Sequence, residues 1–183
     1  MSGWLVFIDE SGLLLLPVVR RTWSRCGQTP VLRQVGRNLK KVSAIAALCV
    51  SPDRREVRLY FQLLVDANFN SVAVLGFLKQ LARHFGAPLL LLWDRARIHR
   101  GFDTAVFLDV LEWLQFYFPP YAPELNPVEY VWSYLKTNPL ANLACPEVAV
   151  LADTGRRHAR SLQHKPGLLR SFIRHSPLSL RLY

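Results

Sequence analysis

The sequence predicts an α/β fold in which helices flank a mixed sheet of five strands. Short apolar runs of strand length recur along the chain, and they end in turn-forming residues. After residue 70 these runs alternate with segments whose apolar residues recur at helical spacing. The resulting order is three strands, then helix, strand, helix, strand and helix, which favours a sheet of mixed direction covered by helices.

The first part of the chain predicts three strands and a long basic connection. Residues 4–8 form an apolar run, and the following Asp9-Glu10-Ser11-Gly12 predicts a turn. Residues 13–19 include Pro17, which predicts an edge or irregular segment, and residues 20–41 predict a loop and hairpin. The runs 42–50 and 57–65 are separated by a short turn, so we expect them to pair antiparallel.

The second part predicts alternating helices and strands. Residues 70–85 have helical spacing, with Asn70 or Ser71 as the cap. Residues 89–93 are apolar throughout, as in a buried parallel strand. We further expect a helix at 102–114, a strand at 115–118, a proline-rich loop at 119–127, a helix at 128–136, and one or two C-terminal helices broken at Pro166-Gly167 and Pro177. Residues 1–145 are predicted to form the core, and 146–183 a basic helical extension of the same domain.

Composition places the chain among globular proteins. Of its 183 residues, 51% are hydrophobic and 20% are charged, enough for one domain with its own core. No apolar run has the length of a membrane span, and the N-terminus lacks signal-peptide features, so we expect a cytoplasmic protein. Cys26, Cys49 and Cys145 form no Cys-x-x-Cys pair, which argues against a zinc site or disulfide framework.

The charge is strongly basic and unevenly distributed. Lys and Arg number 23 against 13 acids, a net charge of +10. Seven basic residues and no acid lie between Ser11 and Pro52, and seven more basic residues and no acid follow Asp153. Basic surfaces are common in soluble proteins, but clustering of this kind favours a nucleic acid as the partner.

Two acidic residues close apolar runs. Asp9 follows the first run, and Asp94 follows the run 89–93. If these strands are parallel neighbours, both carboxylates emerge at the same edge of the sheet, where they would repel each other. A hard divalent cation such as Mg²⁺ or Mn²⁺ relieves that repulsion and leaves coordination positions for phosphate. Taken singly, Asp9 is better interpreted as a turn residue and Asp94 as a surface charge. Together, each at the end of an apolar run, they favour a site.

Glu129 has two interpretations. In Asn126-Pro127-Val128-Glu129 the residues fit an N-cap, a first helical position and a third position, so the tetrapeptide alone favours helix capping. On a helical wheel, however, Glu129 flanks the apolar stripe, and Lys136 lies two turns further on the same flank. In that interpretation Glu129 holds a metal ion and Lys136 contacts DNA phosphate.

Several motifs together resemble one family. They are Phe7-Ile8-Asp9-Glu10-Ser11-Gly12, Arg21-Thr22-Trp23 with Gly27-Gln28-Thr29-Pro30, Asp94 to His99, and residues 119–129 with Trp132 and Leu135-Lys136. With 34 residues between Asp94 and Glu129, the chain resembles the mariner-related bacterial insertion-sequence transposases, whose catalytic domain is the DDE superfamily endonuclease. The resemblance runs from about Trp4 to the C-terminal helices.

The resemblance implies an RNase H-like fold and a two-metal site. It implies that Asp9, Asp94 and Glu129 are catalytic and hold two Mg²⁺ or Mn²⁺ ions. The implied activity is hydrolysis of a phosphodiester at a transposon end, followed by attack of the freed 3′-hydroxyl on target DNA. His99 matches a family histidine and is expected beside the site, as a phosphate contact or as support for another residue. The expected DNA-binding residues are Arg21, Lys40, Lys41, Arg95, Arg97, His99, Arg100 and Lys136.

The chain also departs from the family pattern. Arg95 stands where the family commonly has Asn, and the first catalytic strand begins by Trp4, leaving no room for the usual N-terminal helix-turn-helix. We therefore expect a homodimer or a partner chain that carries the helix-turn-helix. Trp23 is expected to pack the basic hairpin, with stacking on a flipped base as the alternative. Two other functions stay open: a host RNase H-like nuclease, and an inactive or regulatory transposase remnant that binds DNA.

Overall fold

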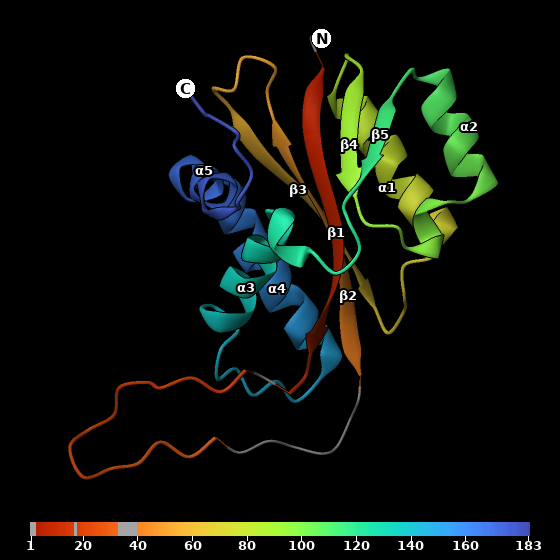
Figure 1. Cartoon of the computed structure of the whole chain (residues 1–183). Coiled ribbons are helices and arrows are strands. Elements are labelled where there is room, and N and C mark those ends of the chain that lie inside the picture. Colours follow the sequence, from red (N-terminus) through yellow and green to blue (C-terminus); the bar gives the residue numbers. More distant parts are fainter. Residues whose placement is uncertain (1–2, 17, 33–39) are drawn as a thin grey trace.

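Five strands form one mixed sheet at the centre of the protein. The computed structural model describes residues 3–16, 18–32 and 40–183. The strands are β1 (Trp4–Leu14), β2 (Lys41–Val50), β3 (Val57–Val65), β4 (Leu89–Trp93) and β5 (Leu114–Tyr117). Their order across the sheet is β3-β2-β1-β4-β5 (Figure 1). β1 pairs antiparallel with β2 and parallel with β4, β2 pairs antiparallel with β3, and β4 pairs parallel with β5.

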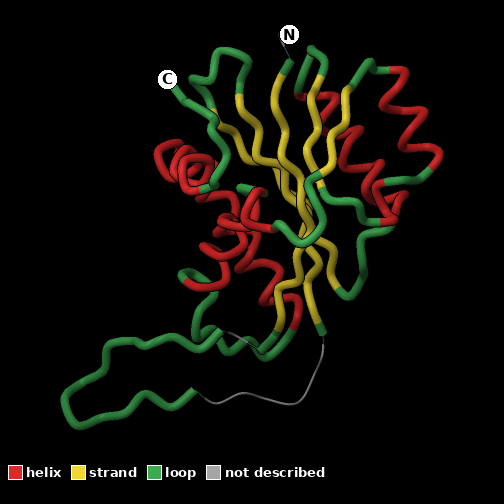
Figure 2. Tube along the Cα trace, in the orientation of Figure 1, coloured by secondary structure: helices red, strands yellow, loops and turns green. Residues whose placement is uncertain are grey.

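Helices cover both faces of this sheet, as Figure 2 shows. One face carries α1 (Ser71–His84) and α2 (Phe102–Val110), and the other carries α3 (Val128–Thr137), α4 (Val148–Gln163) and α5 (Pro166–His175). Two short 3₁₀ helices, η1 (Arg97–His99) and η2 (Pro123–Leu125), lie in the connections. The predicted α/β class with five strands is confirmed. None of the described helices is both long and apolar enough to cross a membrane.

The sheet divides the core into layers. Val6 and Ile8 of β1 pack with α1, whereas Phe7 between them packs with α3 and α5. This follows from the alternation of side chains along a strand. Because both faces of β1 are covered by helices, its run of apolar residues is buried on both sides, as the sequence predicted.

The turn predicted at residues 9–12 is wrong. β1 continues through this segment to Leu14, and it remains paired with β2, with Asp9 opposite Ala46 and Gly12 opposite Ser43. Pairing with a long neighbouring strand outweighs the local turn preference of Ser and Gly. Asp9 therefore lies within a strand rather than after one.

The later elements agree with the predictions except at their ends. Asn70 caps α1, its Oδ1 accepting from the Ala73 N–H at 2.9 Å. The helix predicted at 102–114 ends instead at Val110, because Glu112 adopts a left-handed conformation (φ 54°) and β5 already begins at Leu114. Pro166 starts α5 rather than only breaking a helix, in keeping with the preference of proline for the first helical turn.

A long basic connection leaves the body of the protein between β1 and β2 (Figure 1). Residues 18–32 form no strand, so the described part of the predicted hairpin is a loop. Trp23 is 99% exposed, which contradicts the expectation that it packs this segment. Pro17 and residues 33–39, with Arg33 and Arg37, lie outside the described residues.

Candidate active site

The sheet brings Asp9 and Asp94 to the same face. In the parallel pairing of β1 and β4, Phe7 lies opposite Leu92, and the same register carried two residues further places Asp9 opposite Asp94. Phe7 and Leu92 both pack on the side of the sheet that α3 covers. Since side chains repeat every two residues along a strand, Asp9 and Asp94 point toward α3 as well.

Asn126 positions the third carboxylate. Its buried side chain donates from Nδ2 to the Ile8 carbonyl of β1 (3.0 Å) and accepts at Oδ1 from the Val128 N–H of α3 (3.2 Å). The start of α3 is thereby fixed beside Asp9. The capping box is not formed, because the Asn126 N–H donates to the Pro123 carbonyl (2.9 Å) and not to Glu129. The carboxylate of Glu129 is left at the surface, facing a pocket.

All three carboxylates line that pocket, which has a volume of about 260 Å³. Arg95 and Ala96 form one side of it, and the proline-rich loop 118–123 forms another. Tyr121 in this loop is fully exposed and has a left-handed backbone (φ 59°). The pocket is open to solvent and combines an acidic floor with a basic residue at its edge, an arrangement suited to a phosphate group held through a cation.

Asp9 carries the most strongly perturbed carboxyl group in the pocket. Burial raises its pKa, and the negative charge of Glu129 raises it further, to about 8. The indole N–H of Trp132 donates to Asp9 Oδ2 at 2.9 Å and opposes this rise. Glu10 and Asp94 contribute smaller repulsions. Burial together with nearby carboxylates thus disfavours the ionised form of Asp9, and a positive charge bound in the pocket would favour it.

Asp94 is held by its own loop and by His99. The Ala96 N–H donates to Asp94 Oδ1 at 2.8 Å, and His99 Nδ1 lies 2.9 Å from the same oxygen. The other ring nitrogen, Nε2, lies 3.1 Å from Glu10 Oε1. Burial lowers the pKa of His99, but the hydrogen bond and charge of Glu10, helped by Asp94, raise it overall. Through its two ring nitrogens His99 joins Glu10 of β1 to the loop that carries Asp94.

Trp93 holds the His99 ring in place by stacking on it. Its ring stacks on His99 with centroids 4.4 Å apart and an interplanar angle of 4°. Both residues are almost fully buried. Since the imidazole cannot tilt without losing this contact, its orientation toward Asp94 and Glu10 is fixed.

The donor set fits a hard divalent cation. The pocket offers carboxylate oxygens, which Mg²⁺ and Mn²⁺ prefer, and the raised pKa of Asp9 records a repulsion that a cation would remove. Within residues 3–16, 18–32 and 40–183, however, no three His, Cys, Asp or Glu side chains already surround a single point. The carboxylates therefore share one pocket without forming a closed cage.

The predicted DNA-binding residues fall in three places. Arg95 lines the pocket, and Arg97 and Arg100 are exposed beside it around η1. Arg21 and Lys40 are exposed at the two described ends of the basic connection, where Lys40 lies 3.8 Å from Asp66, and Lys41 begins β2.

Two candidates lie elsewhere than expected. Lys136 donates to Ser11 Oγ at 2.7 Å and so reaches β1 rather than the pocket. His99 is 2% exposed, so of its two expected roles the geometry matches support of Asp94 and not phosphate contact.

Three residues of the site were not predicted in their observed roles. The sequence indicates Trp132 as part of the family motif, and Asn126 as a helix cap. Glu10 was regarded as part of a turn. The role of Trp132 could have been predicted, because it lies three residues after Glu129 and is therefore its neighbour on the helix surface. No sequence signal indicated that Glu10 would meet His99, 89 residues away.

The sheet order and its flanking helices define an RNase H-like fold, and three carboxylates line one pocket beside β1. A family model described as DDE superfamily endonuclease matches residues 4–150, and the chain belongs to this family. This confirms the DDE superfamily endonuclease domain predicted from the motifs. No curated protein sequence matches the chain.

Solved structures of Mos1 transposase share the fold. The Mos1 mariner paired-end complex with Mn superposes with a TM-score of 0.62 at 17% identity, covering 97% of this chain and 56% of the Mos1 chain. The Mos1 strand transfer complex gives a TM-score of 0.61, also at 17% identity, and covers 97% and 56%. The Mos1 catalytic domain alone gives 0.55 at 14% identity and covers 97% and 84%. The chain thus spans little more than half of the Mos1 chains in those complexes.

Proposed function

We propose that this chain is the catalytic part of a DNA transposase, which cuts phosphodiesters at transposon ends and joins the freed 3′ ends to target DNA. The observation that carries the proposal is the meeting of Asp9, Asp94 and Glu129 in one pocket of a DDE superfamily endonuclease. The likeness to Mos1, whose structures include paired-end and strand transfer complexes, supports DNA as the substrate.

In this proposal Asp9, Asp94 and Glu129 hold two Mg²⁺ or Mn²⁺ ions. Such ions activate the attacking oxygen and stabilise the leaving oxygen in phosphoryl transfer. Crystal structures of Mos1 have been obtained with Mg and with Mn, which supports the choice of metal.

The chain's own residues prepare the pocket for this chemistry. Trp132 donates to one Asp9 oxygen, so the other oxygen is directed to the pocket. The Ala96 N–H and His99 fix Asp94 in the same way. Arg95 is placed to pair with a phosphate oxygen, and its positive charge makes the carboxylate pocket attractive to DNA. The proline-rich loop provides a stiff wall against which the DNA strand is positioned.

Recognition of transposon ends requires more protein than these residues provide. We propose that a helix-turn-helix, in a partner chain or in a further part of the same protein, reads the end sequence, and that two copies of the catalytic part act together. The chain matches only 56% of the Mos1 chain, which supports the presence of end recognition in another part or partner.

The decisive test is nicking of supercoiled plasmid DNA in Mn²⁺. We expect nicking by the wild-type protein, loss of more than about 100-fold for Asp94→Asn, and unchanged DNA binding in a filter or mobility assay. Asp103→Asn is the matched control, because Asp103 is an exposed aspartate in the first turn of α2, outside the pocket. Nicking that persists in EDTA, or in Asp94→Asn, would contradict the two-metal proposal.

The same assay separates the two alternative functions. Cleavage of an RNA–DNA hybrid with no cleavage of duplex DNA would identify a ribonuclease. A folded protein that binds DNA and cleaves neither substrate would identify a regulatory remnant. Integration of a pre-cut 3′ end into plasmid DNA, in the presence of the end-binding partner, would support strand transfer directly.

A further inference from the structure

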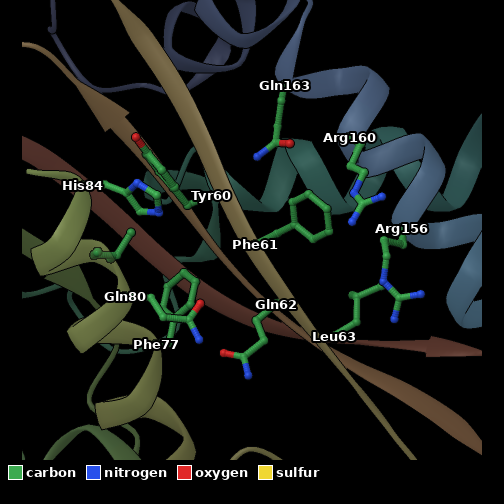
Figure 3. Close-up of a pocket in the computed structure, with 11 residues that line it drawn as sticks. Tyr60, Phe61, Gln62, Leu63, Phe77, Gln80, His84, Arg156, Arg160 and Gln163 are labelled. Carbon is green, nitrogen blue, oxygen red and sulfur yellow. The ribbon is translucent and has the colours of Figure 1, made fainter.

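A second cavity lies at the opposite edge of the sheet from β5. It has a volume of about 380 Å³ and shares no lining residue with the carboxylate pocket. Its floor is the middle of β3, residues 60–63, and its two walls come from α1 and α4 (Figure 3). We call this cavity the β3 slot. It lies where a sixth strand would continue the sheet.

The backbone of β3 is unpaired on the side of this slot. Within the part of the chain that the structure describes, β3 is an edge strand and its one partner is β2. The Asp66 N–H donates to the Lys41 carbonyl of β2. The backbone N–H and C=O groups of even-numbered β3 residues therefore point toward β2. Conversely, Gln163 Nε2 donates to the Leu59 carbonyl at 2.7 Å, so the backbone N–H and C=O groups of odd-numbered β3 residues point away from β2. By this alternation the N–H and C=O groups of Phe61 and Leu63 point into the slot.

The edge lacks the features that usually prevent strand addition. Natural edge strands are protected by lysine, proline, bulges or covering segments. The sequence Leu59-Tyr-Phe-Gln-Leu63 contains neither a charge nor a proline, and its register with β2 is continuous, without a bulge. In addition, Gln62 Oε1 is buried in the slot with no hydrogen-bond partner among the described residues. The slot therefore offers backbone hydrogen bonds that the described residues of the chain do not use.

The walls of the slot are polar and basic. Arg156 and Arg160 of α4 lie on one side with Gln163, and Gln80 and His84 of α1 lie on the other. No acidic residue lines the slot. Figure 3 shows Gln163, Arg160 and Arg156 following one another alongside β3, from Phe61 to Leu63.

The spacing of the two arginines matches that of a strand. Residues four apart on a helix are separated by about 6 Å along its axis. Alternate side chains on a strand are separated by about 6.6 Å and point to the same face. Two carboxylates at positions i and i+2 of an added strand would therefore meet Arg160 and Arg156 together.

We propose that the β3 slot binds an extended acidic peptide of another protein, which adds to β3 as a sixth strand and presents two alternate carboxylates to Arg156 and Arg160. A second copy of this chain is a poor occupant, because its described extended segments are basic: 18–32 carries Arg20, Arg21 and Arg25, and the tail 176–183 carries Arg181, neither with an acid. DNA would satisfy the arginines but has no backbone ladder to pair with Phe61 and Leu63. The proposal does not depend on the nuclease activity.

The first test uses a fluorescein-labelled peptide of alternating glutamate and threonine, followed by fluorescence anisotropy with the whole chain. We expect saturable binding that falls about 10-fold or more when lysine replaces glutamate, since two ion pairs are replaced by repulsion. In a strand every second N–H points to the same edge, so N-methylation of the glutamate amides and of the threonine amides must have unequal effects. We expect one set to abolish binding and the other to leave it within about 2-fold.

The second test exchanges the charges. Arg156→Glu with Arg160→Glu is expected to weaken the glutamate peptide about 10-fold and to strengthen the lysine peptide, a gain that an unfolded protein would not show. Arg174→Glu with Arg181→Glu removes the same charge from exposed positions outside the slot and should leave both affinities unchanged. Equal losses with both methylated sets, or displacement by oligothymidylate that depends on Arg156 and Arg160, would overturn the proposal in favour of a nucleic-acid surface. Asp94→Asn should bind the peptide normally, which separates this proposal from the catalytic one.

Discussion

At the scale of single residues, the site is built around a carboxyl group in an unfavourable position. Asp9 lies on β1 and faces α3, and its negative charge is opposed by burial and by Glu129. The hydrogen bond from the Trp132 indole offsets part of this cost. A positive charge in the pocket would stabilise the ionised carboxylate of Asp9. The neighbouring carboxylate oxygens suit a divalent cation in this role.

This position has a measurable effect on stability in the absence of metal. The pKa of Asp9 is about 8 in the folded chain and near 3.8 without its environment. Between about pH 4 and pH 8 the folded state therefore holds a proton that the unfolded state has lost, so the contribution of Asp9 to the unfolding free energy falls as pH rises. In EDTA, we expect Asp9→Asn, which keeps an oxygen for Trp132, to gain stability over wild type with rising pH in this window.

Urea unfolding at a series of pH values measures the effect. The difference in unfolding free energy between Asp9→Asn and wild type should grow from pH 5 to pH 8 in EDTA. Added Mg²⁺ should stabilise wild type and not the variant, because a ligand that binds only the folded state raises its stability. A difference that is constant across this pH range would show that the carboxyl group of Asp9 is ionised throughout.

At the scale of elements, the joint between β1 and α3 decides whether the carboxylates meet. Asn126 makes this joint with both ends of its amide, at a point just beyond the last β1–β4 pair. Replacing it by alanine leaves the Ile8 carbonyl and the Val128 N–H without these partners. We expect Asn126→Ala to lower the unfolding free energy by about 2–4 kcal/mol, since each unsatisfied buried group costs about 1–3 kcal/mol.

Asn138 provides the matched control for this joint. It is exposed, and its side chain bonds only within its own turn, to the Tyr134 carbonyl and Thr137. Asn138→Ala should change the unfolding free energy by less than about 0.5 kcal/mol in the same urea titration. Similar losses for the two variants would mean that Asn126 does not join the elements.

The elements themselves were largely predictable from sequence, for a physical reason. Strand β4 and the strand 57–65 were predicted to the residue, because apolar runs bounded by Pro, Gly or Asp leave little choice of end. The extension of β1 past Asp9 was missed because it depends on pairing with β2, which local residues do not encode. The same limit applies to the site. Asp9, Asp94 and Glu129, which line one pocket, were predicted from strand ends, helical spacing and family motifs, whereas the contacts of Glu10 and Trp132 depend on how distant elements pack.

At the scale of the whole molecule, the acidic pocket belongs to a chain with a net charge of +10. The basic connection carries part of this charge well away from the body of the protein, as Figure 1 shows. Arg21 and Arg25 are exposed on it, and no acid lies between Ser11 and Pro52. Such a segment can neutralise DNA phosphates beyond the reach of the pocket, and each phosphate neutralised releases counterions.

Salt dependence of DNA binding tests this distribution. For duplex DNA the logarithm of the binding constant falls with the logarithm of salt concentration, with a slope of about −0.9 for each phosphate contact. If Arg21 and Arg25 each neutralise one phosphate, Arg21→Ala with Arg25→Ala should make the slope shallower by about 1.8. Lys79→Ala with Arg83→Ala removes the same charge from exposed positions on α1, on the face of the sheet away from the carboxylates, and should leave the slope unchanged. Equal changes for the two pairs would show that DNA responds to the net charge of the chain, and the basic connection would then have no particular part in binding.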